Sequence, residues 1–184
     1  MRTTVCKYQE VIEFWFTELT PKQWFAKSDE LDQHCAYHFK TTLDAAAKSE
    51  LWPWRETPLG RLAEIIVLDQ FSRNIYRDTP QAFSQDPLAL ALAQEALHHG
   101  YDKQLNDDER GFLLMPYMHS ESKEVHEEAL KLFAEPGLES KYNYEVRHKE
   151  IVDRFGRYPH RNSILGREST AEEIAFLKQP GSGF

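Results

Sequence analysis

The sequence predicts an all-α protein, and three observations support this. Apolar side chains recur at three- and four-residue spacing along most of the chain, as Val11, Trp15 and Leu19 do. No segment alternates apolar and polar residues for long enough to indicate a strand. The links between helical segments are short, which favours neighbouring helices that pack as antiparallel hairpins. We therefore expect about eight helices in a single domain spanning residues 1–184.

Three helices are expected in the first half of the chain. The first spans Tyr8 to Leu19 and stops at Thr20-Pro21. The second begins at Ser28 or Asp29, either of which suits a helix N-cap. The third begins at Thr57-Pro58, a cap followed by proline, and continues through Ile75. Its apolar residues lie nearly all round the helix, which predicts a central position in the core.

Similar start and stop signals divide the second half. Asp86-Pro87 begins a helix that ends at His99-Gly100. Asp107 or Asp108 caps a short helix ending at Met115-Pro116, and Ser120 or Ser122 begins another that runs through Phe133.

The next predicted helix, Lys141 to Phe155, is followed by Gly156. It has one face that should be buried, formed by Tyr144, His148, Ile151 and Phe155. A last short helix begins at a capping box with Ser169 or Thr170, and the tail from about residue 178 should be mobile.

Composition excludes several classes of protein. A formal net charge of −8 argues against general nucleic-acid binding, which normally needs a basic surface. No apolar run approaches the length of a membrane span, and nothing near the N-terminus resembles a secretion signal. Cys6 and Cys35 lack the spacing of metal ligands. We expect a protein of the cytoplasm that does not enter membranes.

One basic segment stands out in this acidic chain. From Arg147 to Arg167 six basic residues stand against two acidic ones, a net charge of about +4 when histidine is neutral. Within it the turn Gly156 to Asn162 places several hydrogen-bond donors close together with no acidic residue among them. Such a segment either neutralises carboxylates of the same chain or binds an external anion.

A ligand site is one interpretation of this segment. Arginine recognises carboxylate and phosphate groups with two parallel hydrogen bonds, and asparagine and histidine can complete the donor set. We predict a pocket that also includes the Asp69 segment and accepts an anionic small molecule or an acidic peptide. The predicted ligand-binding residues are Arg73, Asn74, Arg157, His160, Arg161, Asn162 and Arg167. The alternative is a structural ion-pair network with Asp69, Glu121 or Asp153.

The sequence also offers candidate groups for acid/base chemistry. The candidates are the imidazoles of His119, His148 and His160 and the carboxylates of Asp69 and Glu121. The same residue types could hold a metal ion, but their spacing matches no metal motif, so we predict neither a metal nor a cofactor. His148 lies on an apolar face, which is more typical of a core histidine.

Several long, irregular motifs carry a family resemblance. They are LDQFSRNIYRDTPQAFSQDPLAL, MPYMHSE and RHKEIVDRFGRYPHRNSILGREST, with FWF near the start and QPGSGF at the end. In this order, and over almost the whole chain, they resemble the bacterial domain of unknown function 924 family. The resemblance implies a tetratricopeptide-like fold, a right-handed superhelix of helical hairpins. It implies no activity, so it assigns no functional residue.

Two functions of different classes therefore remain. The first is a binding module that presents an arginine-lined site to an anion. The second is a small-molecule hydrolase or acid/base enzyme that uses the histidines and carboxylates. The sequence does not distinguish them, and it does not predict the oligomeric state.

Overall fold

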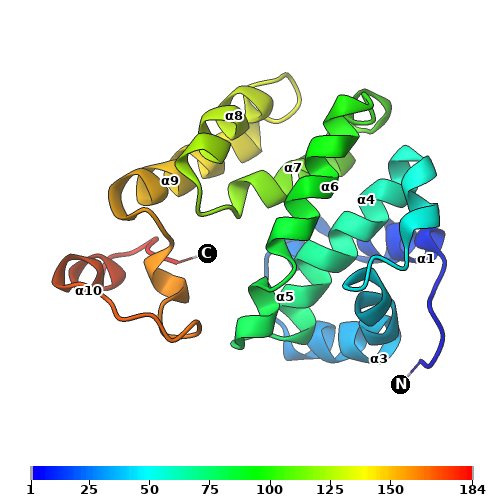
Figure 1. Ribbon diagram of the computed structural model, residues 1–184, viewed down its shortest axis with the longest axis horizontal. Coiled ribbons are helices and arrows are strands. Elements are labelled where there is room, and N and C mark those ends of the chain that lie inside the picture. Colours follow the sequence, from blue (N-terminus) through cyan, green and yellow to red (C-terminus); the bar gives the residue numbers. More distant parts are fainter. Residues whose placement is uncertain (1, 184) are drawn as a thin grey trace.

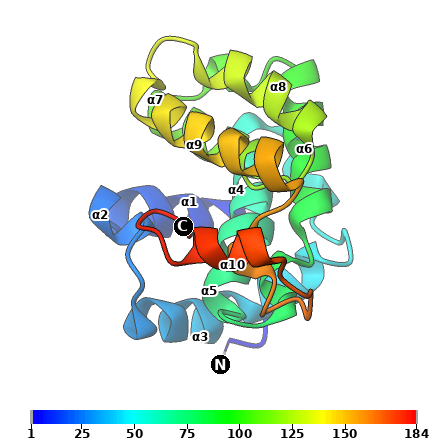
Figure 2. The ribbon, with the colours of Figure 1, turned by 90° about the vertical axis from the view of Figure 1, so that its left-hand side faces the viewer.

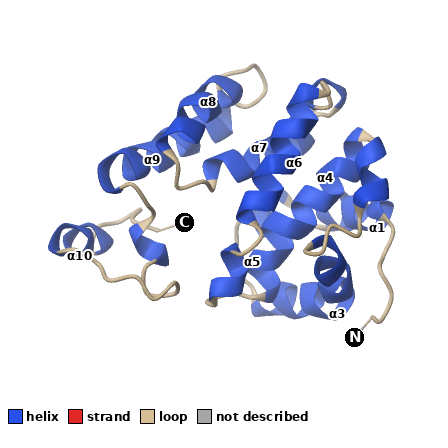
Figure 3. Cartoon of the chain, in the orientation of Figure 1, coloured by secondary structure: helices blue, strands red, loops and turns tan. Residues whose placement is uncertain are grey.

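The computed structural model describes residues 2–183, and within that range the elements are helices joined by loops, with no strand (Figures 1 and 3). The α-helices are α1 (Tyr8–Glu13), α2 (Pro21–Trp24), α3 (Asp29–Ala46), α4 (Pro58–Ile66), α5 (Ser72–Ile75), α6 (Asp86–His98), α7 (Asp107–Met118), α8 (Lys123–Phe133), α9 (Glu139–Phe155) and α10 (Ala171–Leu177). Two π-helical segments, η1 (Phe14–Glu18) and η3 (Val67–Phe71), extend α1 and α4. Short 3₁₀ turns are η2 (Trp52–Glu56), η4 (Pro80–Phe83), η5 (Asp102–Gln104) and η6 (Pro159–Arg161). The all-α prediction is confirmed, whereas the right-handed superhelix stays a prediction.

Most of the predicted helix starts are confirmed. The side chains of Ser28, Thr57 and Ser122 each accept a hydrogen bond from a backbone N–H of the helix that follows. Thr170 and Glu173 form the capping box that begins α10. Gly156 ends α9 in the left-handed conformation, with φ of 70°, which glycine adopts without a steric penalty.

Several predicted boundaries are wrong, and the two at α7 have a local cause. Helix α7 is capped by Asn106, which exchanges hydrogen bonds with Glu109, rather than by Asp107 or Asp108. It continues past Pro116 to Met118, because the proline lies close enough to the end for the last turn to form around it. Asp86 is the first residue of α6, after its N-cap Gln85.

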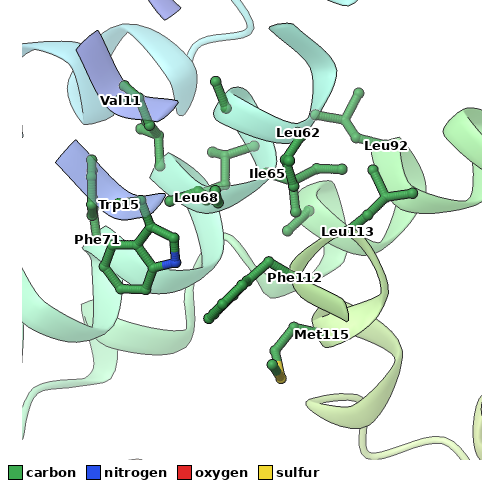
Figure 4. Packing of buried hydrophobic residues seen from close by; sticks show 14 of the residues in the cluster. Val11, Trp15, Leu62, Ile65, Leu68, Phe71, Leu92, Phe112, Leu113 and Met115 are labelled. Carbon is green, nitrogen blue, oxygen red and sulfur yellow. The ribbon is translucent and has the colours of Figure 1, made fainter. Parts of the chain in front are cut away.

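Helix α4 lies at the centre of the molecule, as its all-round apolar surface predicts (Figure 1). It packs against α1 on one side and against α6 and α7 on the other. Figure 4 shows Leu62 and Ile65 of this helix among side chains from α1, α6 and α7. All of these side chains are almost completely buried. This continuous apolar core holds the chain together from α1 to the start of α9.

The last third of the chain forms a second, smaller layer on one side (Figure 2). Helices α8 and α9 pack along each other as a hairpin. Ile151, Val152 and Tyr158 form a separate small apolar cluster, joined by Phe155 and Phe176. The hairpin is attached to the main core by apolar packing, since Ala129, Phe133 and Leu138 belong to that core, whereas the segment after α9 relies on the small cluster and on polar contacts.

The face predicted for α9 is correct for two residues and wrong for a third. His148 and Ile151 are buried, but Tyr144 is 56% exposed. The inward face instead runs through Glu145, His148 and Val152.

No helix among residues 2–183 combines the length and the apolar character that crossing a membrane requires. Part of the predicted mobile tail makes contacts: the Ser182 hydroxyl donates to Leu177 O at 3.1 Å. Its mobility stays a prediction, and Phe184 lies outside the described residues.

Candidate functional site

The centre of the candidate site is a hydrogen bond between Asp69 and His119. Asp69 lies in the π-helical segment η3, and such segments are rare and frequently occur at functional sites. Its side chain is 1% exposed, and its Oδ1 lies 2.7 Å from Nδ1 of His119, the residue that ends α7. Gln70 donates to the other carboxylate oxygen at 2.5 Å. The hydrogen bond therefore fixes Asp69, in the π-helical extension of α4, to His119, at the end of α7.

The electrostatics of this pair determine which atom carries the proton. Burial and the nearby Arg73 charge lower the pKa of His119 below its ordinary value. Burial raises the pKa of Asp69, but the charges of His119 and Arg73 and the hydrogen bonds outweigh it, so that pKa is lowered. A neutral His119 next to an ionised Asp69 must donate through Nδ1. Its Nε2 is therefore an unprotonated acceptor, which no described residue occupies.

Arg73 connects this pair to a second carboxylate. Its Nη1 donates to the backbone oxygen of Asp69 at 2.9 Å and to Oδ1 at 3.0 Å. The same guanidinium forms two parallel hydrogen bonds with Asp86, at 2.8 and 2.9 Å. The side chains of Arg73, Asp86 and His119 remain 19%, 16% and 16% exposed, so the edge of this network contacts solvent. Arg73 has its hydrogen-bonding needs met by internal acceptors.

Arg161 of η6 is held differently. Its guanidinium carbon lies 4.6 Å from the ring centre of Phe83 and 4.7 Å from that of Tyr158, a cation–π arrangement on two rings. It donates one hydrogen bond, from Nη2 to the backbone oxygen of His119 at 3.0 Å. Its nearest carboxylate oxygen, on Asp86, is 3.5 Å away and is already bonded to Arg73. Its buried Nε has no hydrogen-bond partner among residues 2–183.

Charge balance at Arg161 is correspondingly incomplete. The side chain is only 7% exposed. Burial, followed by repulsion from Arg73, lowers the pKa of Arg161. An arginine in that position is stabilised by additional negative charge. Within residues 2–183, Arg161 is therefore a buried arginine whose nearest carboxylate is shared with Arg73.

The other predicted basic residues are engaged in internal contacts. Arg167 makes two hydrogen bonds with Glu121, at 2.7 and 2.9 Å, and a third with Asn162. Arg157 forms two with Glu173, both within 2.8 Å. These pairs attach the loop after α9 to α10 and to the segment following α7. Arg157 and Arg167 therefore fit the structural ion-pair network that the sequence offers as the alternative to a ligand site.

The structure separates the predicted pocket into several places. Asn74 donates to Asp32 of α3 at 2.8 Å and does not join the donors of η6. The amide of Asn162 bonds Ser169. His160 lies 5.6 Å from Tyr158, ring centre to ring centre, and burial, followed by Arg161, lowers its pKa to about 4. Of the predicted set, Arg73, Arg161 and His160 lie around His119.

The remaining catalytic candidate, His148, is a core residue. Its Nδ1 bonds the backbone oxygen of Tyr144 at 2.7 Å, and burial lowers its pKa to about 3. Its ring contacts Tyr158 edge-on, with the centres 5.7 Å apart. Within residues 2–183 no three His, Cys, Asp or Glu side chains gather as ligands for a metal ion.

Sequence reasoning missed a second buried pair beside the first. His126 of α8 and Glu145 of α9 are completely buried, with Nδ1 and Oε1 2.6 Å apart. The Tyr158 hydroxyl lies 3.1 Å from Nε2 of His126 and donates to Met118 O at 2.6 Å. Glu145 lies three residues before His148, so a helical face drawn through both would have indicated that it points inward.

Two cavities, of about 180 and 280 Å³, lie away from these residues. The smaller is bordered by α3, α5 and the turn before α6, and the larger by the α8–α9 connection. Neither is lined by Asp69, His119 or Arg161. The candidate site is thus a buried charged network with a solvent-exposed edge.

The fold and network define an all-helical protein with a buried network of charged side chains beside its apolar core. The chain belongs to the family described as bacterial protein of unknown function (DUF924), whose model matches residues 11–181. This confirms the resemblance carried by the sequence motifs. A solved structure of a protein of unknown function, ATU0120 from Agrobacterium tumefaciens, is 36% identical, with a TM-score of 0.86, and the match covers 93% of this chain and 96% of that one. No curated protein matches the chain.

Proposed function

We propose that this protein is a binding module for a small anionic molecule that carries a phosphate or carboxylate group. The site is the solvent-exposed edge of the Asp69–His119–Arg73 network, together with Arg161 and His160. The observation that carries the proposal is Arg161: a buried guanidinium that, among residues 2–183, donates one hydrogen bond, to a backbone carbonyl, and shares the Asp86 carboxylate, 3.5 Å away, with Arg73. An external anion would supply the charge and the acceptors that residues 2–183 do not.

Burial makes this deficit costly. A buried donor without a partner costs roughly 1–3 kcal/mol, and a charged group more. Arginine arranged between two aromatic rings presents its remaining N–H groups in a fixed plane, which suits a phosphate or carboxylate. His160 and His119 stay neutral at pH 7, because burial lowers both pKa values, so they add hydrogen bonding without further charge. The site is expected to favour small anions of low charge over long acidic peptides.

The test compares anion-induced stabilisation in matched variants. Thermal unfolding is measured with phosphate or acetate against chloride at equal ionic strength. A ligand at one hundred times its dissociation constant contributes about 2.7 kcal/mol, which is roughly 5 to 10 °C for a chain of this size. Arg161→Ala should abolish the shift. Arg154→Ala removes the same charge from an exposed pair with Glu172 and should leave it unchanged.

An acid/base enzyme is the second candidate, and one contact favours it. Asp69 fixes the His119 tautomer at 2.7 Å and leaves Nε2 as a neutral acceptor, the arrangement in which a carboxylate orients a general base. In this case Arg161 would hold the anionic part of a substrate while Nε2 accepts a proton from water or a hydroxyl. Hydrolysis of small phosphate or carboxylate esters that is lost in His119→Gln but retained in His148→Gln would support this function.

We place the protein in the bacterial cytoplasm as part of this proposal. Cys6 and Cys35 are both free, buried thiols. Free thiols persist in reducing compartments, where disulfides are rare.

A further inference from the structure

The pair formed by His126 of α8 and Glu145 of α9 lies outside the candidate site, and neither side chain reaches solvent. Nδ1 of His126 is 2.6 Å from Oε1 of Glu145. Groups that can titrate are rarely buried completely, because burial disfavours their charged forms. The hydrogen bonds around the pair indicate which of its atoms carry protons.

The other ring nitrogen of His126, Nε2, must carry a proton. It lies 2.8 Å from the backbone oxygen of Ser120, which can only accept a hydrogen bond. Its second neighbour is the Tyr158 hydroxyl at 3.1 Å, and this hydroxyl donates its own proton to the backbone oxygen of Met118 at 2.6 Å. Toward Nε2 the hydroxyl is therefore an acceptor as well. Both contacts are satisfied when Nε2 is an N–H group.

A second proton must then lie between Nδ1 and Oε1. In a neutral His126 with its proton on Nε2, Nδ1 is an acceptor, and an ionised Glu145 offers acceptors alone. Two acceptors 2.6 Å apart would repel each other. The proton is either on Nδ1, which makes His126 an imidazolium, or on the carboxyl group of Glu145. In both cases the pair holds one proton more than a neutral histidine and an ionised glutamate would.

The second oxygen of Glu145 indicates that the carboxyl group carries this proton. Oε2 is buried and has no hydrogen-bond partner among residues 2–183. A buried oxygen without a partner is far more costly when it belongs to an ionised carboxylate than when it belongs to a neutral acid. Burial raises the pKa of Glu145, and the opposing hydrogen bond with His126 does not cancel that effect.

The titratable groups around the pair leave this charge balance unchanged. Lys149 of α9 is the nearby cation, and it is already paired with Glu127 and Asp153, at 2.7 and 2.6 Å. Burial lowers the pKa of His148 to about 3, and burial raises the pKa of Tyr158, so both are neutral at pH 7. One step further out, His119 at the end of α7 faces His148, and Arg161 of η6 faces Tyr158.

Loss of the carboxyl proton would rearrange the hydrogen bonds. The proton leaves to solvent, and the imidazole proton moves from Nε2 to Nδ1, where the ionised Glu145 accepts it. Nε2 is then an acceptor that faces the backbone oxygen of Ser120, and the two repel. The Tyr158 hydroxyl can satisfy Nε2 by turning its proton away from Met118 O. The turn between α7 and α8 therefore loses one hydrogen bond at Met118 and one at Ser120.

We propose that Glu145 is a neutral carboxylic acid at pH 7 and that its deprotonation switches the hydrogen bonds of the turn joining α7 and α8. The switch acts beside the anion site, since Ser120 follows His119 and the Tyr158 ring packs on Arg161. Regulation of that site rests on the proposed function. The switch itself does not, so both experiments use buffers without phosphate or carboxylate.

The first experiment is urea unfolding of the wild type and Glu145→Gln from pH 5.5 to 7.5. The glutamine amide donates to Nδ1 as the protonated carboxyl does, but it cannot ionise. The ratio of folding equilibrium constants, wild type over variant, should fall about tenfold per pH unit, because Glu145 ionises above its ordinary pKa of 4.5 in the unfolded chain alone. Glu150→Gln, on the exposed side of the same helix, should give a constant ratio. A constant ratio for Glu145→Gln as well would overturn the proposal.

The second experiment needs the wild type alone and follows its NMR spectrum from pH 6 to 10. At pH 7 we expect a neutral His126 with its proton on Nε2 and a ¹³C carboxyl resonance of Glu145 typical of a protonated acid. Both should change in one transition with the amides of His119 and Glu121, whose peptide groups contain Met118 O and Ser120 O. An imidazolium at pH 7, or a Glu145 that stays protonated until the chain unfolds, would overturn the proposal. So would amides that shift independently of the carboxyl resonance.

Discussion

Replacing Arg73 by alanine tests whether the buried charged network stabilises the fold. The variant removes four hydrogen bonds to Asp69 and Asp86. It leaves Asp69, 1% exposed, with His119 and Gln70 as its side-chain partners among the described residues. Breaking a buried ion pair by removing one partner costs about 3–5 kcal/mol, because the other charge remains buried. For a chain of this length we expect a loss of roughly 6 to 20 °C in melting temperature.

Urea unfolding of Arg73→Ala, with Arg154→Ala as the control, measures this cost directly. Arg154 and its partner Glu172 are 48% and 62% exposed, so the control should lose no more than about 1 kcal/mol. The pKa of Asp69 is lowered in the folded protein, so its contribution is present above the ordinary value of 3.8 and is lost as the pH falls below it. The difference in unfolding free energy between wild type and Arg73→Ala should therefore be present at pH 7 and narrow as the pH falls below 3.8. A cost below about 1 kcal/mol at pH 7 would refute a structural role for the network.

Three further outcomes are expected. Burial lowers the pKa of His148 to about 3 and that of His160 to about 4, so below pH 6.5 the unfolded chain binds more protons than the folded one. At pH 5 each of these two histidines should therefore lower the free energy of unfolding by about 2 kcal/mol. His148→Gln should remove the share that comes from His148. Cys35 should react with iodoacetamide only on unfolding, because it is completely buried and burial raises its pKa to about 12. Tyr158→Phe leaves His126 and Met118 without the tyrosine hydroxyl and should cost about 1–2 kcal/mol in urea unfolding.

Local rules predict most of this fold. Thr57-Pro58, Gly156 and the Thr170 capping box each depend on residues within one turn of helix, so their neighbours in sequence determine them. The same rules fail where a distant partner competes. Asp86 has the cap-plus-proline signal, yet it lies inside α6, where its carboxylate is bonded by Arg73, thirteen residues earlier.

In the candidate site, too, distant contacts decide the outcome, and the sequence predicts fewer of its features than it does of the fold. The sequence groups Arg73 with Arg161 in one predicted anion site and names His119 separately as an acid/base candidate, and the structure brings all three side chains into one region. It cannot assign partners, since Asp69 and His119 are fifty residues apart in the chain. Arg157 and Arg161 have the same chemistry four residues apart, but the first faces Glu173 and the second faces two aromatic rings. That difference is set by tertiary packing.

The most direct test of the proposed function observes His119 while phosphate is added. Its Nε2 faces no described residue, so an anion bound at Arg161 should change the ¹⁵N resonance of that imidazole and raise its pKa, because negative charge favours the protonated form. We predict a saturable change in wild type and in Arg154→Ala, and none in Arg161→Ala. An imidazole resonance that does not respond to phosphate, or that responds equally in Arg161→Ala, would contradict the anion site.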